Sequence, residues 1–256
     1  MSVFKKPSDR TYSMSRGEGL LKLDGLPDFE HIGDFENLNL KPDQEFLERY
    51  SKNFATKTLA KKIQTKRGAT MDLTVLQRTS AIKQIIFMGL ERSLLQAAVP
   101  STTTAPVTVR KGGIISLGVR DVAVTDVKVG EVVLPVTAYK VDRRTGLVQV
   151  YDGGENVTVT YTAKAITEAD GRKKIGGFSV EGLRGHFIFR GLDSVNDEPL
   201  LVNAWVAEFA VSGDTPLVGG DDLDQLQITA TLYPDTTQPE EDQLFTVEAI
   251  LDGDPA

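Results

Sequence analysis

The chain has 256 residues, of which 40% are hydrophobic, and this is enough to build a sizeable buried core. It contains no cysteine, which excludes disulfides, thiol nucleophiles and thiolate metal sites. Its formal net charge of -7 argues against a protein that grips nucleic acid, because such binding needs a surplus of lysine and arginine. Residues 1–15 lack an apolar stretch, and the longest apolar run, 85–90, is too short to cross a bilayer. We therefore expect production in a reducing cytoplasm and no membrane association.

Two segments of the N-terminal third are predicted to be irregular. Residues 1–15 are polar and basic and are expected to form an N-terminal arm. Residues 42–68 are expected to form a long basic loop. Seven basic residues and no acidic residue occur in its section 49–67: Arg49, Lys52, Lys57, Lys61, Lys62, Lys66 and Arg67.

A single helix is predicted over residues 80–98. Ile82, Ile86, Leu90 and Leu94 recur at a spacing of four, which places them on one face of a helix. Thr79 or Ser80 can cap its start, and Pro100 supplies a stop.

Most of the remaining chain alternates apolar and polar residues, which is the pattern of strands with one buried face. The clearest case is 226–233. The loop 142–146, with its late glycine, favours a hairpin between the flanking strands. The predicted strands are 71–76, 107–110, 132–141, 147–151, 156–163, 178–180, 186–190, 201–211, 226–233 and 244–251. The predicted fold is all-β with one flanking α-helix, in a single domain over 1–256.

The C-terminal segment, 234–256, is acidic. It has no basic residue, and its acidic residues are Asp235, Glu240, Glu241, Asp242, Glu248, Asp252 and Asp254. This segment and the basic loop are either two separately solvated surfaces or partners that attract each other, within one subunit or between two.

Few residues have the chemistry of a catalytic or metal site. Only His31 and His186 supply imidazoles, and neither has a metal-binding spacing. Asp221, Asp222 and Asp224 lack the spacing of a calcium loop and are interpreted as a solvated turn. We predict no catalytic, cofactor-binding or metal residues, and no enzyme activity.

The segment 17–50, GEGLLKLDGLPDFEHIGDFENLNLKPDQEFLERY, resembles the opening of the major tail tube proteins of long non-contractile-tailed bacteriophages, the siphovirus tail tube family. The matching positions are Asp24, Gly25, Pro27, Phe29, Ile32, Gly33, Asp34, Leu47, Glu48, Tyr50 and Ser51. The likeness continues at 139–161 and 201–233, and so covers most of the chain.

The resemblance implies a β-sandwich or half-barrel subunit whose sheets close into a ring on oligomerisation. Hexameric rings then stack into a hollow virion tail tube, with other tail proteins at its ends and double-stranded DNA passing non-specifically through its lumen. It implies no cofactor. The basic loop is the expected arm between rings, with these candidate contact residues: Phe46, Leu47, Tyr50, Phe54, Lys57, Lys61 and Lys62.

Two other kinds of protein remain as alternatives. The first is the tube protein of a contractile tail or of a machine like the type VI secretion system. The second is a carbohydrate-binding β-sandwich, which should expose aromatic residues on one face. The single tryptophan, Trp205, lies instead in an expected core strand.

Overall fold

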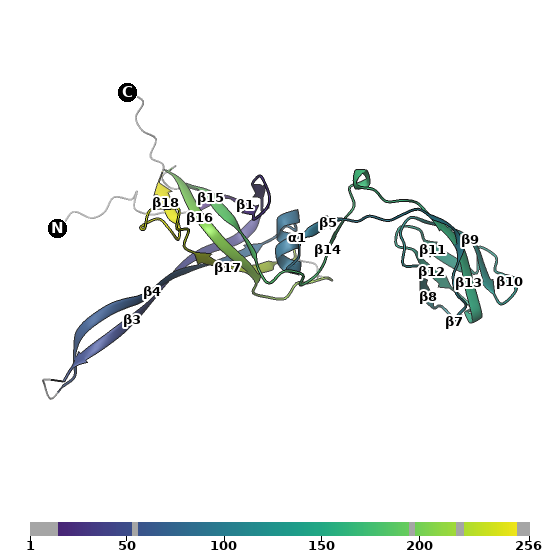
Figure 1. Ribbon diagram of the computed structural model, residues 1–256, viewed down its shortest axis with the longest axis horizontal. Helices are drawn as coiled ribbons and strands as arrows, with labels where there is room; N and C mark the ends of the chain where they lie inside the picture. The colour runs from purple at the N-terminus through teal and green to yellow at the C-terminus, as the bar shows by residue number, and fades with distance from the viewer. Residues whose placement is uncertain (1–14, 53–55, 195–197, 219–222, 250–256) are drawn as a thin grey trace, which may run out of the picture. The chain divides into compact units, whose positions relative to one another are not determined.

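The computed structural model describes residues 15–52, 56–194, 198–218 and 223–249. The chain forms two compact units (Figure 1): unit 1 comprises residues 1–91 and 175–256, and unit 2 comprises residues 92–174. Each unit has its own hydrophobic core. The chain thus divides where the sequence predicts one domain, because the apolar side chains of unit 2 pack on one another.

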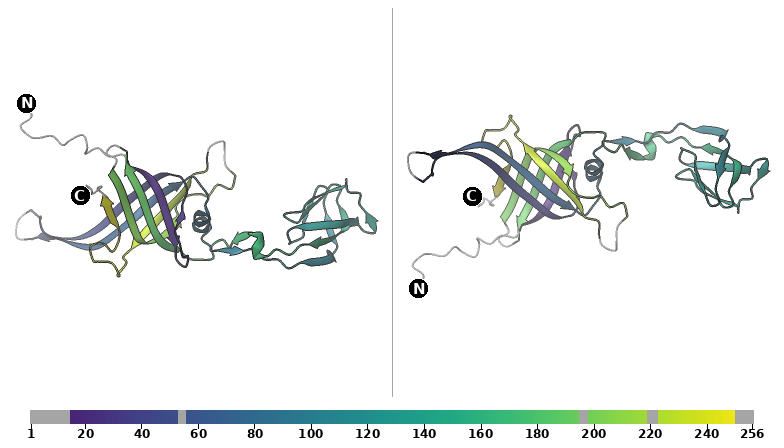
Figure 2. Two further views of the ribbon diagram at one scale, coloured as in Figure 1. Left: turned by 90° about the horizontal axis from the view of Figure 1, so that it is seen from above. Right: turned by 90° about the horizontal axis from the view of Figure 1, so that it is seen from below.

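Unit 1 is built on one antiparallel sheet. Its elements are β1 (Ser15–Leu23), β2 (Glu30–His31), β3 (Phe35–Ser51), β4 (Thr58–Val75), α1 (Ser80–Phe87), β15 (Leu183–Asp193), β16 (Glu198–Val211), β17 (Leu226–Tyr233) and β18 (Thr246–Ala249). The strand order is β2-β1-β15-β16-β17-β4-β3, and β18 pairs with β16 beside this path. Figure 2 shows the sheet curling so that β3 and β4 lie across from β15 and β16. The sheet does not close into a barrel.

The core of unit 1 lies on the inner face of this sheet. In β17, Leu226, Ile228, Ala230 and Leu232 are all buried, as the alternation predicts. The second half of β4 continues the pattern, and it pairs with β17 along its whole buried length. The apolar face of α1 joins the same core. Strand alternation therefore sets the inner face of unit 1.

The predicted helix 80–98 is wrong in its length, because α1 ends at Phe87. Thr79 caps its start, since its hydroxyl accepts from the backbone N–H of Ile82. Met88 adopts a left-handed conformation, and a Cβ on Gly89 would lie 1.9 Å from the carbonyl oxygen of Gly176. Only glycine allows two backbones to approach so closely. A tertiary contact, and not Pro100, thus ends the helix.

The predicted basic loop 42–68 is also wrong, because these residues belong to a β-hairpin. β3 and β4 pair from Phe35 and Val75 out to Ser51 and Thr58. The pairing of β4 with β17 ends at Ala69, so the outer half of the hairpin runs beyond the sheet. Neither of its faces is covered by the described residues. The usual alternation of a half-buried strand is therefore missing from this part of the sequence.

Unit 2 consists of two small sheets around a second core. Its elements are β6 (Val99–Thr103), β7 (Val107–Val109), β8 (Ile114–Ser116), β9 (Val122–Val129), β10 (Val132–Val133), β11 (Tyr139–Asp142), β12 (Leu147–Val150), β13 (Gly154–Ala163) and the short 3-10 helix η2 (Glu168–Asp170). β10-β9-β13-β6, with β7 also on β13, forms one sheet, and β11-β12-β8 forms the other. Val148 and Val150 of β12 share this core with Val157 and Val159 of β13.

The chain passes between the units at two points that lie in one small ribbon. β5 (Glu91–Ser93) contains the outward crossing and β14 (Lys173–Ile175) contains the return, and these two strands pair with each other. Beyond them, the backbone N–H of Leu94 donates to the carbonyl of Arg172 at 2.8 Å. Unit 2 is therefore an insertion whose two ends lie side by side.

Most of the predicted strands are confirmed, but three differ. Residues 178–180 form no strand. The predicted strand 132–141 is split into β10 and β11 by a turn that contains Pro135, which lacks the N–H a ladder needs. The predicted strand 244–251 is shorter, since β18 covers Thr246–Ala249 and residues 250–251 lie outside the described part of the chain.

The predicted hairpin around 142–146 is confirmed by the pairing of β11 with β12. Asp142 organises the turn, because its carboxylate accepts from the hydroxyl of Thr145 at 2.6 Å and from the backbone N–H of Arg144 at 3.1 Å. The bond from Thr145 is the main reason that the pKa of Asp142 is lowered. Gly146 follows with φ +69°.

We expect Gly146→Ala to destabilise unit 2 by about 2–3 kcal/mol. A Cβ there would lie 2.0 Å from the carbonyl oxygen of Val119, and the backbone conformation disfavours any side chain. Gly112→Ala is the matched control, because Gly112 has φ +71° but open space around it, and about 1 kcal/mol is expected. Chemical denaturation followed by circular dichroism measures both. Equal losses would contradict the steric part of this explanation.

Candidate assembly interface

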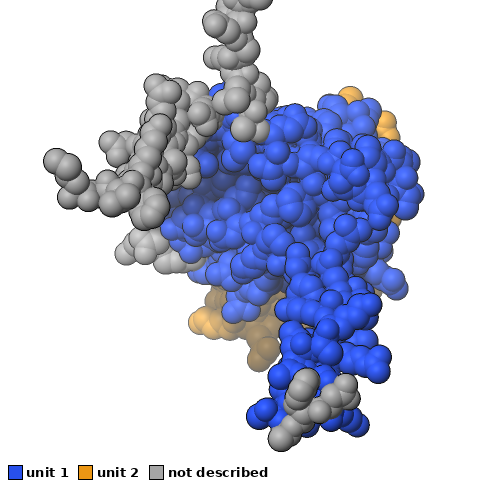
Figure 3. Space-filling model, turned by 90° about the vertical axis from the view of Figure 1, so that its left-hand side faces the viewer, with its two compact units in different colours: residues 1–91, 175–256 blue, residues 92–174 orange. Residues whose placement is uncertain are grey.

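The outer half of the β3–β4 hairpin projects from unit 1 without cover from the described chain. We call residues 43–51 and 58–67 the arm; they pair across the hairpin, while tip residues 53–55 lie outside the described chain. Figure 3 shows the arm as a blue projection from unit 1. Five large apolar side chains of the arm are 42–60% exposed: Phe46, Leu47, Tyr50, Leu59 and Ile63. Exposed apolar groups in such number mark a surface for a partner.

Both faces of the arm carry apolar residues. Directly paired residues of antiparallel strands share a face. Leu47 pairs with Ile63, and we call their side the aliphatic face. Tyr50 pairs with Leu59, and Phe46 lies on the same side as Tyr50, so we call this side the aromatic face. A ribbon that lay on a single surface would need only one apolar face. The arm therefore exposes apolar side chains on both of its faces.

Charged groups on the aromatic face neutralise one another. The Nζ of Lys62 lies 4.0 Å from the ring centroid of Phe46 and 3.8 Å from Oε1 of Glu48. The hydroxyl of Tyr50 donates to Oε2 of Glu48 at 2.7 Å, and this bond raises the pKa of Tyr50. Nearer the sheet, on the side of Leu47, Lys66 lies 3.1 Å from both Asp43 and Glu45. The three acidic residues of the arm are therefore already paired.

The remaining charge of the arm is positive. Arg49 and Lys61 face each other on the aliphatic face, and the exposed Lys57 directly precedes β4. None of these three forms an ion pair with another residue of the described chain. Like charges paired directly across two strands repel each other, so this face is more stable against an acidic partner.

The acidic C-terminal segment packs beside the base of the arm. We call residues 234–245, which follow β17, the strap. Glu240 of the strap lies 3.8 Å from Arg67 at the base of the arm, so one pair between the basic and acidic segments forms within the chain. The cations near the tip of the arm take no part in it. Asp252 and Asp254 lie outside the described residues.

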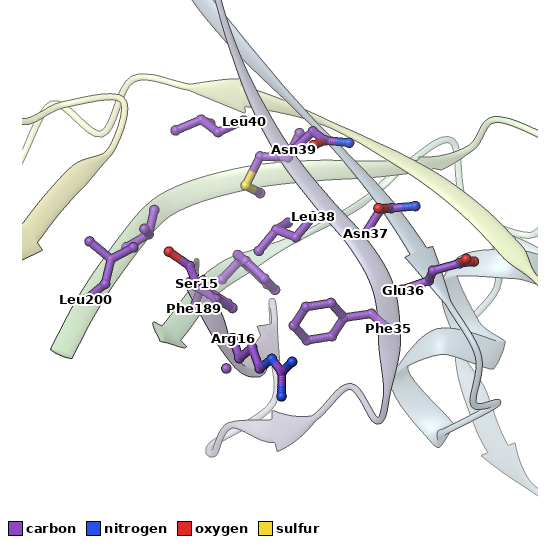
Figure 4. Close-up of a pocket in the computed structure, with 14 residues that line it drawn as sticks. Ser15, Arg16, Phe35, Glu36, Asn37, Leu38, Asn39, Leu40, Phe189 and Leu200 are labelled. Atoms are coloured by element: carbon purple, nitrogen blue, oxygen red, sulfur yellow. The ribbon is translucent and has the colours of Figure 1, made fainter. Parts of the chain in front are cut away.

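The two ends of the open sheet border one cavity on the inner face of unit 1. It has a volume of about 390 Å³ and is lined by the start of β1, by 35–40 of β3 and by side chains of β4, β15 and β16. In Figure 4, Phe35 and Leu38 of β3 lie over Phe189 of β15. Arg16 and Glu36 are the ionisable side chains of this lining. β3 pairs with β4 alone, so its other edge is free in the described chain.

The predicted contact residues largely lie together on the arm. Phe46, Leu47, Tyr50, Lys57, Lys61 and Lys62 are all exposed there, whereas Phe54 lies outside the described residues. Leu59 and Ile63 complete the two apolar faces and were not among the predicted contact residues. Only the pairing register of the hairpin places these two residues beside Leu47 and Tyr50. Irregularities between Glu45 and Phe46 and between Arg49 and Tyr50 hide this register in the sequence.

The segment that carries the family resemblance shapes one end of the sheet. A turn follows β1, with the N–H of Leu26 bonded to the carbonyl of Leu23. Ile32 is buried in the core, and the N–H of Gly33 donates to Nδ1 of His31. The other nitrogen of His31 lies 3.3 Å from Glu18. These residues have structural roles in unit 1.

The described residues contain no group of three or more histidine, aspartate or glutamate side chains that could hold a metal ion. Asp224 of the predicted acidic turn pairs with Arg78 at 2.7 Å, and Asp221 and Asp222 lie outside the described chain. Within the same described ranges, no helix is long and apolar enough to span a membrane.

A family model described as "Protein of unknown function UCP028589" matches residues 15–245. The match includes both units and nearly all of the described chain, and the chain belongs to this family. Among curated proteins, none is similar to it.

Proposed function

We propose that the chain is a structural subunit that assembles with copies of itself into the tail tube of a long-tailed bacteriophage. The observation that carries this proposal is the arm, with apolar residues on both faces, next to an open sheet. Copies of unit 1 pair through their free edges into rings, six subunits to a ring by the resemblance, and the arm of each copy is covered by the next ring. The sandwich or half-barrel sheets then surround a lumen.

The charges of the two units support a conduit for DNA. Unit 1 carries 17 lysine and arginine residues against 28 aspartate and glutamate residues, whereas unit 2 carries 12 against 8. A tube built from an acidic unit repels phosphate and lets DNA slide through. The same charge attracts the basic arm of a neighbouring copy. On this proposal the chain is no enzyme, carries no cofactor, functions in the virion, and contacts other tail proteins at the ends of the tube.

A tube protein of a contractile or secretion machine is the nearest alternative, and it shares this assembly logic. A sheath protein that binds the outside of the tube would distinguish the two. The carbohydrate-binding alternative draws little support from Trp205, whose indole N–H is engaged by the strap at 2.8 Å.

Negative-stain electron microscopy of the purified chain, across concentration and salt, tests the proposal. We expect rings or hollow tubes of uniform width. A protein that stays monomeric at every concentration, even after addition of preformed tube ends from a tail, would overturn it.

We further expect the triple variant Lys57→Glu, Lys61→Glu, Lys62→Glu to give shorter tubes in much lower yield. The change places acidic groups where the arm meets the acidic unit 1 of another copy, and like charges repel over about 10 Å at 0.1 M salt. The control is Lys111→Glu, Lys128→Glu, Lys140→Glu, which makes the same charge change on unit 2. Unchanged length and yield in the arm variant would sink the idea of charge-guided docking.

A further inference from the structure

The strap closes over the outer face of the sheet, opposite the core. The backbone N–H of Asp235 donates to the carbonyl of Gln243 at 2.9 Å, so the two ends of the strap are tied together. Between them, the carbonyl of Asp242 accepts from the indole N–H of Trp205 at 2.8 Å. Trp205 is thus the side chain on the sheet to which the strap is fastened.

Trp205 stands beside His186 because of a bulge. Gly185 pairs with Ala207 but Phe187 pairs with Ala204, so β16 has an extra residue opposite His186. The imidazole lies between two aromatic rings, with centroid distances of 5.1 Å to Phe29 and 5.1 Å to Trp205. His186 therefore packs directly against the residue that holds the strap.

The imidazole is placed for its neutral form. Its Nε2 is buried and has no hydrogen-bond partner in the described chain, whereas the hydrogen bond with the buried Asn203 raises the pKa of the ring and opposes burial only in part. Protonation would add an N–H at Nε2 with no acceptor, which is costly in a buried place. Burial, accordingly, is the main cause of a lowered pKa for His186.

The charged groups around His186 act in opposite directions. Lys22 pairs with it across β1 and lowers its pKa, whereas Asp235 of the strap raises it. Hydrogen bonds from Thr237 hold the pKa of Asp235 below its ordinary value of 3.8, so Asp235 stays charged above pH 5. His186 is therefore the group of this cluster whose charge changes below the ordinary histidine pKa of 6.5.

We propose that His186 is the sensor of an acid-operated latch, whose protonation breaks the packing around Trp205 and releases the strap. The direction follows from the lowered pKa: the closed form is fully stable above pH 6.5, the value of a free histidine, and loses stability as the pH falls. The latch itself needs only one chain. On the proposed function, it also bears on assembly, because release frees Glu240 from Arg67 at the base of the arm.

The single tryptophan makes the latch measurable in the full-length protein. Fluorescence of Trp205 is followed from pH 8 to pH 5 at a concentration where the protein is monomeric, so that failure of assembly cannot affect the result. We expect one reversible transition with its midpoint below pH 6.5 in the wild type. In parallel, proteolysis after Glu240 and Glu241 at low pH should be faster in the wild type than in a variant without the His186 imidazole.

Two substitutions assign the transition, since the chain has only two histidines. His186→Gln cannot titrate and should remove both the fluorescence transition and the acid-dependent cleavage. His31→Gln changes the exposed histidine beside Glu18 and should retain both. The proposal is overturned if the wild type shows no transition, if His186→Gln keeps it, or if His31→Gln removes it. Should His186→Gln not fold, Asn203→Ala, which removes the hydrogen bond to the imidazole, should shift the midpoint further down, and an unchanged midpoint would count against the latch.

Discussion

The double variant Leu47→Asp, Ile63→Asp should remain folded and fail to form tubes. Both side chains lie on the aliphatic face of the arm and contact no core, so the free energy of unfolding should change little. On the proposed function they are covered in the assembly, and the loss of two apolar anchors worth about 1.5 kcal/mol each corresponds to self-association roughly 100-fold weaker. Buried carboxylates weaken it further. Sedimentation velocity and electron microscopy measure the loss.

A second pair of substitutions tests whether both faces of the arm are covered. Tyr50→Asp with Leu59→Asp changes the aromatic face and should block assembly as strongly. Val132→Asp with Val136→Asp is the control, because these valines of unit 2 are exposed and lie far from the arm in sequence. If the aromatic-face variant assembles like the wild type, only one face meets a partner. Tubes formed by both variants would exclude the arm as an interface.

The two units should unfold independently. Phe187→Ala removes a large, fully buried ring from the core of unit 1 and should cost about 3–5 kcal/mol, or roughly 10 °C in Tm. Trp205 is the only tryptophan and lies in unit 1, so its fluorescence follows that unit alone. Circular dichroism follows both. We expect Phe187→Ala to move the fluorescence transition and leave the transition of unit 2 unchanged.

Val148→Asp provides the reverse case. It places a carboxylate in the core of unit 2, where the valine is fully buried, and should unfold that unit. The fluorescence transition of Trp205 should stay at the wild-type temperature. A common shift of both transitions in either variant would show that the units fold as one body.

Sequence patterns predicted many of the strands that have one face buried by their own chain, but they missed β1 and β9. β17 is the best example, since all four alternating apolar residues are in the core. The end of α1 could not be predicted from the sequence, because it depends on the close approach of Gly89 to the backbone of Gly176, which is far away in the sequence. The division into two units was equally hidden, since alternation shows that a face is buried but not in which core.

The candidate interface was predicted in part. Charge and aromatic residues pointed to Phe46, Tyr50 and the lysines, because these types stand out in a polar segment. The outer half of the hairpin gave no periodic signal, since neither of its faces is buried by the described chain. Leu59 and Ile63 become visible only once the register is known.

The two points at which the chain enters and leaves unit 2 are paired, so a foreign domain can be inserted in place of this unit. β5 and β14 lie side by side, so any folded module whose termini are close together can replace residues 94–172 with little loss of loop-closure entropy. The close contact of Gly89 with Gly176 keeps this junction fixed from the unit 1 side. If unit 1 alone builds the tube, every subunit of the filament would then display one copy of the grafted domain at a regular spacing.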